Sequence, residues 1–162
     1  MGMSGCVSAP AGLNTLTHIN PRLFRGTWYV IARLNHPAER GLTRESVSFA
    51  PSLAGNRWKV MHYGWRNESG SWEQTNIPTI PARAQFRGAS MLGLFKGMIP
   101  SAVHLVAVDR SYRYALMCGP DYKQFWVLSK EADPSEESVL EMLNEAKAKG
   151  FPVEEALFQQ YR

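Results

Sequence analysis

The sequence contains few of the features that mark an enzyme, a metal protein or a membrane-spanning chain. Its two cysteines, Cys6 and Cys118, allow at most one disulfide. The four histidines show no close ligand spacing, so the sequence predicts no metal site. No apolar run approaches the roughly 20 residues that a membrane-spanning helix needs. Nucleophile elbows, phosphate-binding loops and paired catalytic carboxylates are also lacking, which argues against an enzyme.

The charge of the chain is not concentrated on one segment either. There are 18 basic and 14 acidic residues, a net charge of +4. The basic residues near the start form no dense run and stand in no nucleic-acid-binding motif, so nucleic acid is not expected as a partner: Arg22, Arg25, Arg33, Arg40 and Arg44. With 162 residues, of which 44% are hydrophobic, the chain is long enough for one domain with a sizeable core or a sheet closed around a cavity.

Short apolar or alternating runs, separated by turn signals, fill the chain from Arg25 to about Lys130. They predict eight strands, at residues 27–34, 43–50, 57–65, 71–78, 82–88, 102–109, 113–118 and 124–130. Eight such strands favour an all-β fold, an antiparallel up-and-down β-barrel, because closing the sheet removes its exposed edges.

One helix is predicted after the barrel, at about 134–149. Asp133 supplies an N-cap with Glu136 three residues later, and Gly150 marks the end. An apolar stripe on this helix is expected to pack against the outer wall of the barrel: Val139, Leu140, Met142, Leu143 and Ala146. A short final strand is predicted at about 155–160.

Three sequence blocks, in this order, resemble the lipocalins: Gly26-Thr27-Trp28-Tyr29, Val108-Asp109-Arg110-Ser111-Tyr112 and Phe125-Trp126-Val127-Leu128-Ser129-Lys130. Glu39-Arg40-Gly41-Leu42 and Ala115-Leu116-Met117-Cys118-Gly119-Pro120 are similar to the bacterial outer-membrane lipocalins, relatives of apolipoprotein D. The resemblance implies a lipocalin domain over residues 18–162, with the barrel at about 25–131. It also implies a carrier that binds, stores or transports fatty acids or lysophospholipids, without a cofactor.

The resemblance assigns five residues to the base of the barrel: Gly26, Trp28, Asp109, Tyr112 and Lys130. The family usually has an arginine where Lys130 stands, packed flat over the tryptophan. A lysine makes a cation–π contact with Trp28 but cannot stack or fork its hydrogen bonds equally well.

Side chains alternate in and out along a strand, so counting from Trp28 and back from Lys130 predicts the barrel lining. The residues expected to contact a ligand are Ala32, Glu45, Val47, Phe49, Val60, His62, Thr75, Ile77, Ala84, Phe86, Val103, Leu105, Met117, Trp126 and Leu128. Val30, Ala107 and Ala115 are expected on the same side. The alanines favour an interior with unfilled space for an acyl chain. The alternative is a barrel whose interior is filled by its own side chains.

Glu45 and His62 are the polar exceptions in this lining. Reflecting the second and third strands about the turn at 53–55 places the two side chains nearly opposite each other, near the open end. Our hypothesis is that Glu45 meets an amine or hydroxyl of a lipid head and that protonated His62 meets a phosphate or carboxylate. An ordinary cross-strand pair at a wet rim is the equal alternative.

The N-terminus carries a different signal. Ser4-Gly5-Cys6 is similar to the end of a bacterial lipoprotein signal, in which small residues precede the cysteine that is lipidated, although the charged and apolar regions of such a signal do not stand upstream. We expect acylated Cys6 to anchor the protein at the periplasmic face of the outer membrane, with residues 1–17 as a flexible tether. A free thiol is the alternative. Cys118 is predicted to be a buried thiol on the sheet.

The segment 88–100 joins two predicted strands yet is rich in Met, Leu, Phe and Ile. It is expected to act as a lid over the barrel mouth, and an extended hairpin that packs its own apolar residues is the alternative. A rival function follows from the same segment. In that case the barrel is filled and the protein is an interaction or structural module of the envelope, forming a homodimer through loop 88–100.

Overall fold

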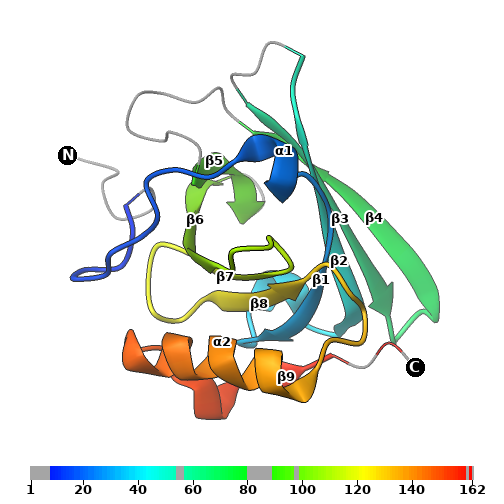
Figure 1. The fold of residues 1–162 in the computed structure, drawn as a ribbon. Coiled ribbons are helices and arrows are strands. Elements are labelled where there is room, and N and C mark those ends of the chain that lie inside the picture. Colours follow the sequence, from blue (N-terminus) through cyan, green and yellow to red (C-terminus); the bar gives the residue numbers. More distant parts are fainter. Residues whose placement is uncertain (1–7, 54–56, 80–88, 97–98, 160, 162) are drawn as a thin grey trace.

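The computed structural model describes residues 8–53, 57–79, 89–96, 99–159 and 161, and nine strands form one sheet in them (Figure 1). The strands are β1 Gly26–Arg33, β2 Leu42–Pro51, β3 Trp58–Arg66, β4 Ser71–Ile77, β5 Ser90–Lys96, β6 Ile99–Val108, β7 Tyr114–Cys118, β8 Phe125–Ser129 and β9 Leu157–Phe158. Their order in the sheet is β4-β3-β2-β1-β8-β7-β6-β5, and β9 pairs with β1. Neighbours are antiparallel throughout.

The sheet curls so strongly that its two ends approach each other. Within β1–β4 and within β5–β8 each strand pairs with the next one along the chain, and the β1–β8 pairing joins the two halves. At the ends of the order, β4 and β5 are linked by a bridge between Thr79 and Gly93. The predicted all-β, antiparallel up-and-down architecture is confirmed, as a curled half-barrel in the described residues.

The segment 88–100 differs from the prediction. Residues 90–96 form β5, paired with β6 in a register that sets Met91 opposite Val103, so this stretch is part of the sheet and not a lid. Met91 is buried in the barrel interior, which explains why an apolar residue stands at this position. The hairpin alternative describes this stretch better. The strand predicted at 82–88 lies outside the described residues, and dimerisation through 88–100 stays a prediction.

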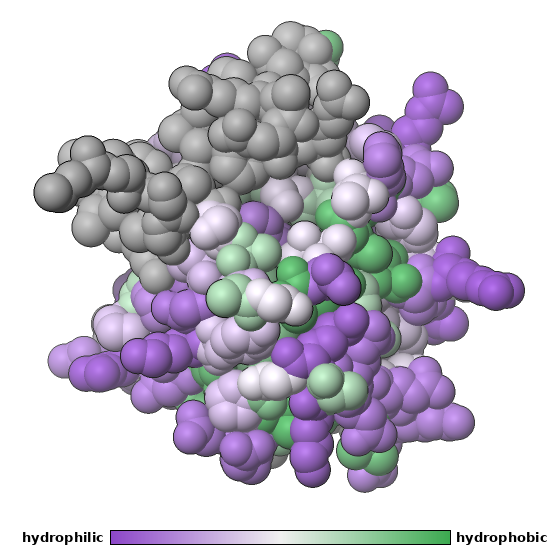
Figure 2. Space-filling model, turned by 90° about the vertical axis from the view of Figure 1, so that its left-hand side faces the viewer, coloured by the Kyte–Doolittle hydropathy of each residue, from purple (hydrophilic) through white to green (hydrophobic). Residues whose placement is uncertain are grey.

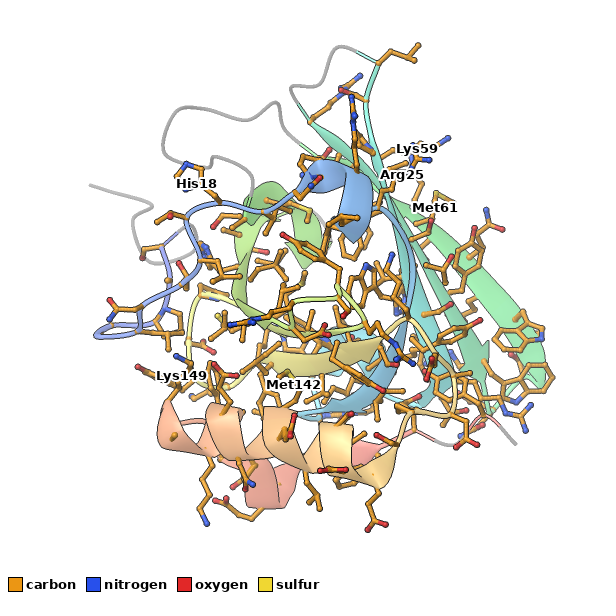
Figure 3. All side chains as sticks on the ribbon, in the orientation of Figure 1. His18, Arg25, Lys59, Met61, Met142 and Lys149 are labelled. Atoms are coloured by element: carbon orange, nitrogen blue, oxygen red, sulfur yellow. The ribbon has the colours of Figure 1, made fainter. Side chains whose placement is uncertain are left out.

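Helix α2, Glu136–Ala148, lies across the outer wall of the barrel, as predicted (Figure 1). Its N-cap is Ser135 and not Asp133, because the Ser135 hydroxyl accepts a hydrogen bond from the backbone N–H of Ser138. Met142 projects from α2 toward the sheet (Figure 3), where it packs with Phe125 and Val127 of β8.

Three further predictions concern the side chains and the strand of this outer layer. Leu140, which was placed in the apolar stripe, is half exposed and lies outside the contact. Cys118 is buried in the layer beneath α2, and burial raises the pKa of its thiol to about 12, as suits an inert structural cysteine. Strand β9 is shorter than predicted and pairs with the end of β1.

Residues 8–17, part of the stretch predicted as a flexible tether, contact the barrel. The backbone N–H of Leu16 donates to the carbonyl of Leu105 over 2.9 Å, and the Tyr122 hydroxyl donates to the carbonyl of Ala11. Leu13 packs in the outer layer and Leu16 on the barrel interior. The stretch therefore crosses the barrel and contacts it. Residues 1–7, with Cys6, lie outside the described part.

One end of the barrel is closed by a short helix that the sequence did not reveal, α1, Pro21–Phe24 (Figure 1). Asn20 caps it, and Phe24 enters the barrel fully buried. The Trp28 indole N–H donates to the carbonyl of Phe24 over 2.8 Å, and the two rings lie 5.2 Å apart. Helix and tryptophan together plug this end of the barrel.

The residues assigned to the base meet at this closed end. Lys130 Nζ lies 4.6 Å from the centre of the Trp28 ring, as predicted, and donates to the carbonyls of Phe24 and Arg25. Gly26 is at φ +112°, a backbone conformation that favours glycine, and a Cβ there would also stand 3.1 Å from the Lys130 ammonium.

Asp109 and Tyr112 support the same end from the β6–β7 turn. The Asp109 carboxylate accepts hydrogen bonds from the backbone N–H groups of Ser111, Arg113 and Tyr114. This fixes the turn and places the Tyr112 hydroxyl 2.9 Å from the N–H of Asn20, the cap of α1.

Replacing Lys130 by methionine should lower the free energy of unfolding by about 1–2 kcal/mol, because the cation–π contact and two charge-assisted hydrogen bonds are lost. The matched change Lys59→Met, at an exposed position on the outside of β3 (Figure 3), should have an effect under about 0.5 kcal/mol. Urea unfolding curves measure both. Equal effects of the two substitutions would show that Lys130 does not brace the base.

Candidate functional site

A bulge at the end of β1 reverses the side-chain directions that alternation predicts. Val30 pairs with Leu128, but Ala32 pairs with the adjacent Val127, so β1 carries one extra residue between them. Ala32, predicted to face the ligand, therefore points outward and packs beneath α2. Its successor, Arg33, pairs with Trp126 and turns into the barrel, where 2% of its side chain is exposed.

A second bulge lies at the start of β2. Arg44 adopts φ +51°, and the β2–β3 register shifts between Thr43 and Ser46. Leu42 and Glu45 are both buried as a result, although a regular strand would send them to opposite faces. Gly64 makes room for both, because a Cβ there would meet Leu42 at 3.3 Å and Glu45 at 3.4 Å.

A third bulge, between Leu105 and Ala107, lies in the β6–β7 pairing. Ala107 was expected inside the barrel but packs in the outer layer with Val106. Ala32 and Ala107 thus contribute no space to the interior. Ala115 does belong to the interior cluster.

A cavity of about 350 Å³ lies inside the barrel. Nine of the predicted contact residues line it: Val47, Phe49, His62, Thr75, Ile77, Val103, Met117, Trp126 and Leu128. Val60 and Leu105 are fully buried in the interior cluster behind this lining. Ala84 and Phe86 lie outside the described residues.

The remaining lining was not named among the predicted contacts: part of it lies in connections or against the alternation, whereas Arg66, Glu73, Ser101 and Gln124 continue the inward alternation of their strands. Besides Val30, which alternation placed correctly, these residues are His36, Ala38, Glu39, Leu42, Arg66, Glu73, Ser101, Ala102 and Gln124. His36, Ala38 and Glu39 lie in the connection between β1 and β2. Gln124 lies in the connection between β7 and β8, and Arg66 is the last residue of β3. Glu39 belongs to a short 3₁₀ turn, Pro37–Glu39, within the block similar to bacterial lipocalins, and that similarity was the available signal for it.

The cavity has an apolar wall and one polar end. Phe49 contacts Phe24 of the closed base, with ring centres 5.1 Å apart. Because β1 begins beside α1 and ends at Arg33, the groups around Arg33 lie at the opposite end. Trp126, Glu39 and His62 line the cavity there.

A buried ion pair lies at the polar end of the cavity. Arg33 Nε donates to Glu45 Oε2 over 2.5 Å, and both side chains are almost completely buried. Nη1 of Arg33 donates to the carbonyl of Leu34, and Nη2 donates to the carbonyls of Glu39 and Leu42, at 2.9–3.2 Å. These bonds satisfy the buried cation and fix the path of the β1–β2 connection.

Glu45 and His62 do meet, with His62 Nε2 3.1 Å from Glu45 Oε1 and 18% of the His62 side chain exposed. Glu45 itself is fully buried, and its two carboxylate oxygens face Arg33 and His62. The pair is therefore not an ordinary contact at a wet rim. The direct contact between Glu45 and a lipid head that we hypothesised is wrong for this geometry, because His62 stands between Glu45 and the cavity.

Glu39 is the acidic group that adjoins this pair. Its Oε1 accepts a hydrogen bond from the Trp126 indole N–H over 2.9 Å, whereas Oε2 is buried and accepts none from the described residues. Burial, together with the charge of Glu45, raises the pKa of the Glu39 carboxyl from 4.5 to about 7. Glu39 is thus a carboxyl group at the cavity that forms no salt bridge with the described residues.

A second ion pair stands nearer the solvent. Arg66 Nε and Nη2 each donate to one oxygen of Glu73 over 2.9 Å, a bidentate contact between neighbouring strands. The hydrogen bond from Arg66 holds the pKa of Glu73 below its ordinary value. Both residues line the cavity, and their charges compensate each other.

The half-barrel is closed at one end, contains an apolar cavity and carries polar groups at the other end. These features are typical of a protein that binds a small hydrophobic molecule. The sequence profile of the lipocalin-like domain matches residues 19–160, and the chain belongs to this lipocalin family. Proteins of the family bind small hydrophobic ligands and are not enzymes.

Three bacterial outer membrane lipoproteins are similar to this chain over most of its length. The chain is 32% identical to the outer membrane lipoprotein Blc of Escherichia coli K12, over 93% of this chain and 84% of that protein. It is 31% identical to Blc of Citrobacter freundii, over 92% and 83%, and 24% identical to Blc of Vibrio cholerae, over 98% and 92%.

Solved structures agree on the fold. Insecticyanin from the tobacco hornworm Manduca sexta matches with a TM-score of 0.72 at 16% identity, covering 96% of this chain and 88% of that one. Apocrustacyanin C1 matches with a TM-score of 0.70 at 14% identity, covering 86% and 78%. At such identities the likeness concerns the fold alone.

Ionisation of Glu39 should make the stability depend on pH. Between pH 4.5 and about 7 the folded state holds a proton that the unfolded chain has lost, so the free energy of unfolding should fall as pH rises through this window. The Glu39→Gln variant has no such proton. We expect its stability relative to the parent chain to improve by on the order of 2 kcal/mol from pH 4.5 to pH 8. Urea unfolding with a chelator present measures this, and a difference independent of pH would contradict the raised pKa.

Proposed function

We propose that this protein binds fatty acids or lysophospholipids, for storage or transport at the bacterial envelope. The observation that carries the proposal is the cavity of about 350 Å³, with an apolar wall and a polar end. A single acyl chain matches this layout, with its tail toward Phe49 and its head toward His62. The volume lies at the lower end of the range typical of small-molecule pockets.

The energetics favour a ligand with one long tail. Each buried methylene contributes about 0.8 kcal/mol. Ten of them give roughly 8 kcal/mol before the loss of ligand freedom, which corresponds to micromolar binding at best. A polar head also needs a partner at the mouth, because an unpaired buried charge would cancel this gain.

His62 is our candidate for that partner. It lines the cavity, and Glu45 holds its ring from behind through the contact at Nε2. A protonated imidazole so placed attracts a carboxylate or a phosphate. Glu45, sequestered by Arg33, acts on the head only through His62.

The proposed location is the periplasmic face of the outer membrane, with acylated Cys6 as the anchor. The support is the name of the relatives, outer membrane lipoprotein, together with the Ser4-Gly5-Cys6 motif. None of the helices in the described part of the chain has the length and apolar character to cross a bilayer. A lipid-anchored carrier would exchange acyl chains with the membrane beside it.

The rival function, an envelope interaction module with a filled barrel, has less support. It requires the chain's own side chains to occupy the interior, whereas the described residues leave the cavity between Val47 and Val103. On the face shown in Figure 2, hydrophilic residues cover most of the lower part, with hydrophobic ones between them. Homodimer formation is compatible with either function.

Filling the cavity should weaken lipid binding strongly without unfolding the barrel. Val47 of β2 lines the cavity and is partly exposed, whereas its neighbour Ser48 faces the other side of the sheet. We expect Val47→Trp to weaken binding of oleate and of lyso-phosphatidylethanolamine at least tenfold, and Ser48→Trp to change it less than twofold. Displacement of a fluorescent fatty acid measures both. Equal affinities in the two variants would place the ligand outside the cavity.

The role of His62 can be tested separately. His62→Ala should weaken binding of the anionic fatty acid about five- to tenfold, because the imidazole no longer faces the carboxylate as a hydrogen-bond donor. The fatty alcohol of equal chain length should bind the variant and the parent protein alike. The same displacement assay at pH 6 gives both values. A loss that is equal for acid and alcohol would mean that His62 only shapes the cavity.

A further inference from the structure

Three potential metal ligands converge at the polar end of the cavity, although sequence spacing gave no sign of them. Glu39 comes from the 3₁₀ turn after β1, Glu45 from β2 and His62 from β3. Each offers one ligand atom, and the three atoms lie within 4.8 Å of one another. A tetrahedral zinc ion with bonds of 2.0–2.2 Å holds its ligands roughly 3.3–3.6 Å apart. A shift of about 1 Å, through the side-chain torsions of Glu39, would bring this set to that geometry.

In each carboxylate, one oxygen accepts a hydrogen bond from a neighbouring side chain, and the other oxygen is available to a metal ion. Arg33 Nε donates to Glu45 Oε2, and the Trp126 indole N–H donates to Glu39 Oε1. Glu45 Oε1 faces His62, and Glu39 Oε2 is buried without a donor among the described residues. Such outer contacts orient the ligands of metal sites in proteins. The unsatisfied Glu39 oxygen is the independent sign that a positively charged partner belongs here.

The charges of the cluster favour a cation as well. Two carboxylates adjoin a single guanidinium, so with a neutral His62 the cluster carries one excess negative charge when Glu39 is ionised. A divalent ion reverses the excess to one positive charge, which the carboxylate or phosphate of a ligand would then neutralise. One imidazole with two carboxylates suits zinc and its first-row neighbours better than magnesium or calcium, which prefer oxygen ligands alone.

The geometry points to a divalent transition-metal site formed by Glu39, Glu45 and His62, with an open coordination position toward the cavity. Both Glu39 and His62 line the cavity, so a fourth ligand must come from that side. The ion replaces the hydrogen on His62 Nε2, which leaves to solvent with any proton that Glu39 holds. The open position would take the carboxylate or phosphate of an amphiphile, and this last step rests on the proposed function.

The test is a calorimetric titration of the full chain, freed of lipid and stripped of metal with a chelator, with Zn²⁺ as the probe. We expect one ion per chain, and at least tenfold weaker binding in His62→Gln and in Glu39→Gln. The matched controls His18→Gln and Glu154→Gln, at exposed positions away from the cluster (His18 is labelled in Figure 3), should bind Zn²⁺ as the parent chain does. Thermal unfolding and near-UV circular dichroism verify that each variant is folded.

The visible absorption of Co²⁺ added to the parent chain gives a readout that needs no variant. An intense spectrum, as low-coordinate sites produce, supports the inference, and the weak spectrum of the hydrated ion contradicts it. Absence of Zn²⁺ binding to the parent chain would overturn the inference, as would equal binding by the cluster variants and the controls.

A second titration, with oleate and oleyl alcohol in the presence and absence of Zn²⁺, tests the open position. The ion should strengthen oleate binding at least fivefold and leave the alcohol unchanged. If Zn²⁺ binds but oleate affinity does not respond, the head group does not reach the ion. If neither lipid binds under any condition while Zn²⁺ does, the proposed function fails and the metal site stands.

Discussion

The polar end of the cavity depends on the buried pair formed by Arg33 and Glu45. Burying two charges is costly, and the cost is offset only where geometry is good and the remaining donors are satisfied. Here three backbone carbonyls of the β1–β2 connection satisfy the guanidinium, and His62 completes the environment of the carboxylate. Removing one partner of such a pair costs about 3–5 kcal/mol. The pair thereby fixes the connection that carries Glu39 and orients the imidazole that faces the cavity.

Much of the architecture followed from simple periodicity. Alternation from Trp28 and from Lys130 placed Val30, Trp126 and Leu128 correctly inside the barrel, with Phe125 and Val127 outside under α2. The lysine at the base makes the predicted cation–π contact. Strands with one apolar face and a helix with an apolar stripe are local patterns, and local patterns can be detected in a single sequence.

What could not be predicted arose from bulges and from contacts between distant segments. An extra residue before Ala32 sends that alanine outward and Arg33 inward, and no composition signal marks it. The left-handed Arg44 likewise turns Leu42 to the inside, next to Glu45, which alternation had already placed there. Glu39 lies in a connection, where alternation has no meaning, and β5 was hidden in a glycine-containing stretch that resembled a loop. Because Glu39 could not be placed beside Glu45 and His62 from sequence spacing, the cluster that we propose as a metal site was not predicted.

We propose that the apolar cavity of the barrel receives an acyl chain with its head toward His62. A crystal structure of the protein grown with a fatty acid brominated near its methyl end tests it most directly, because bromine scatters anomalously. We expect a bromine peak inside the barrel near Phe49, with the carboxylate at the His62 end. A bromine peak on the outer surface, or an interior filled by the chain's own side chains, would contradict it.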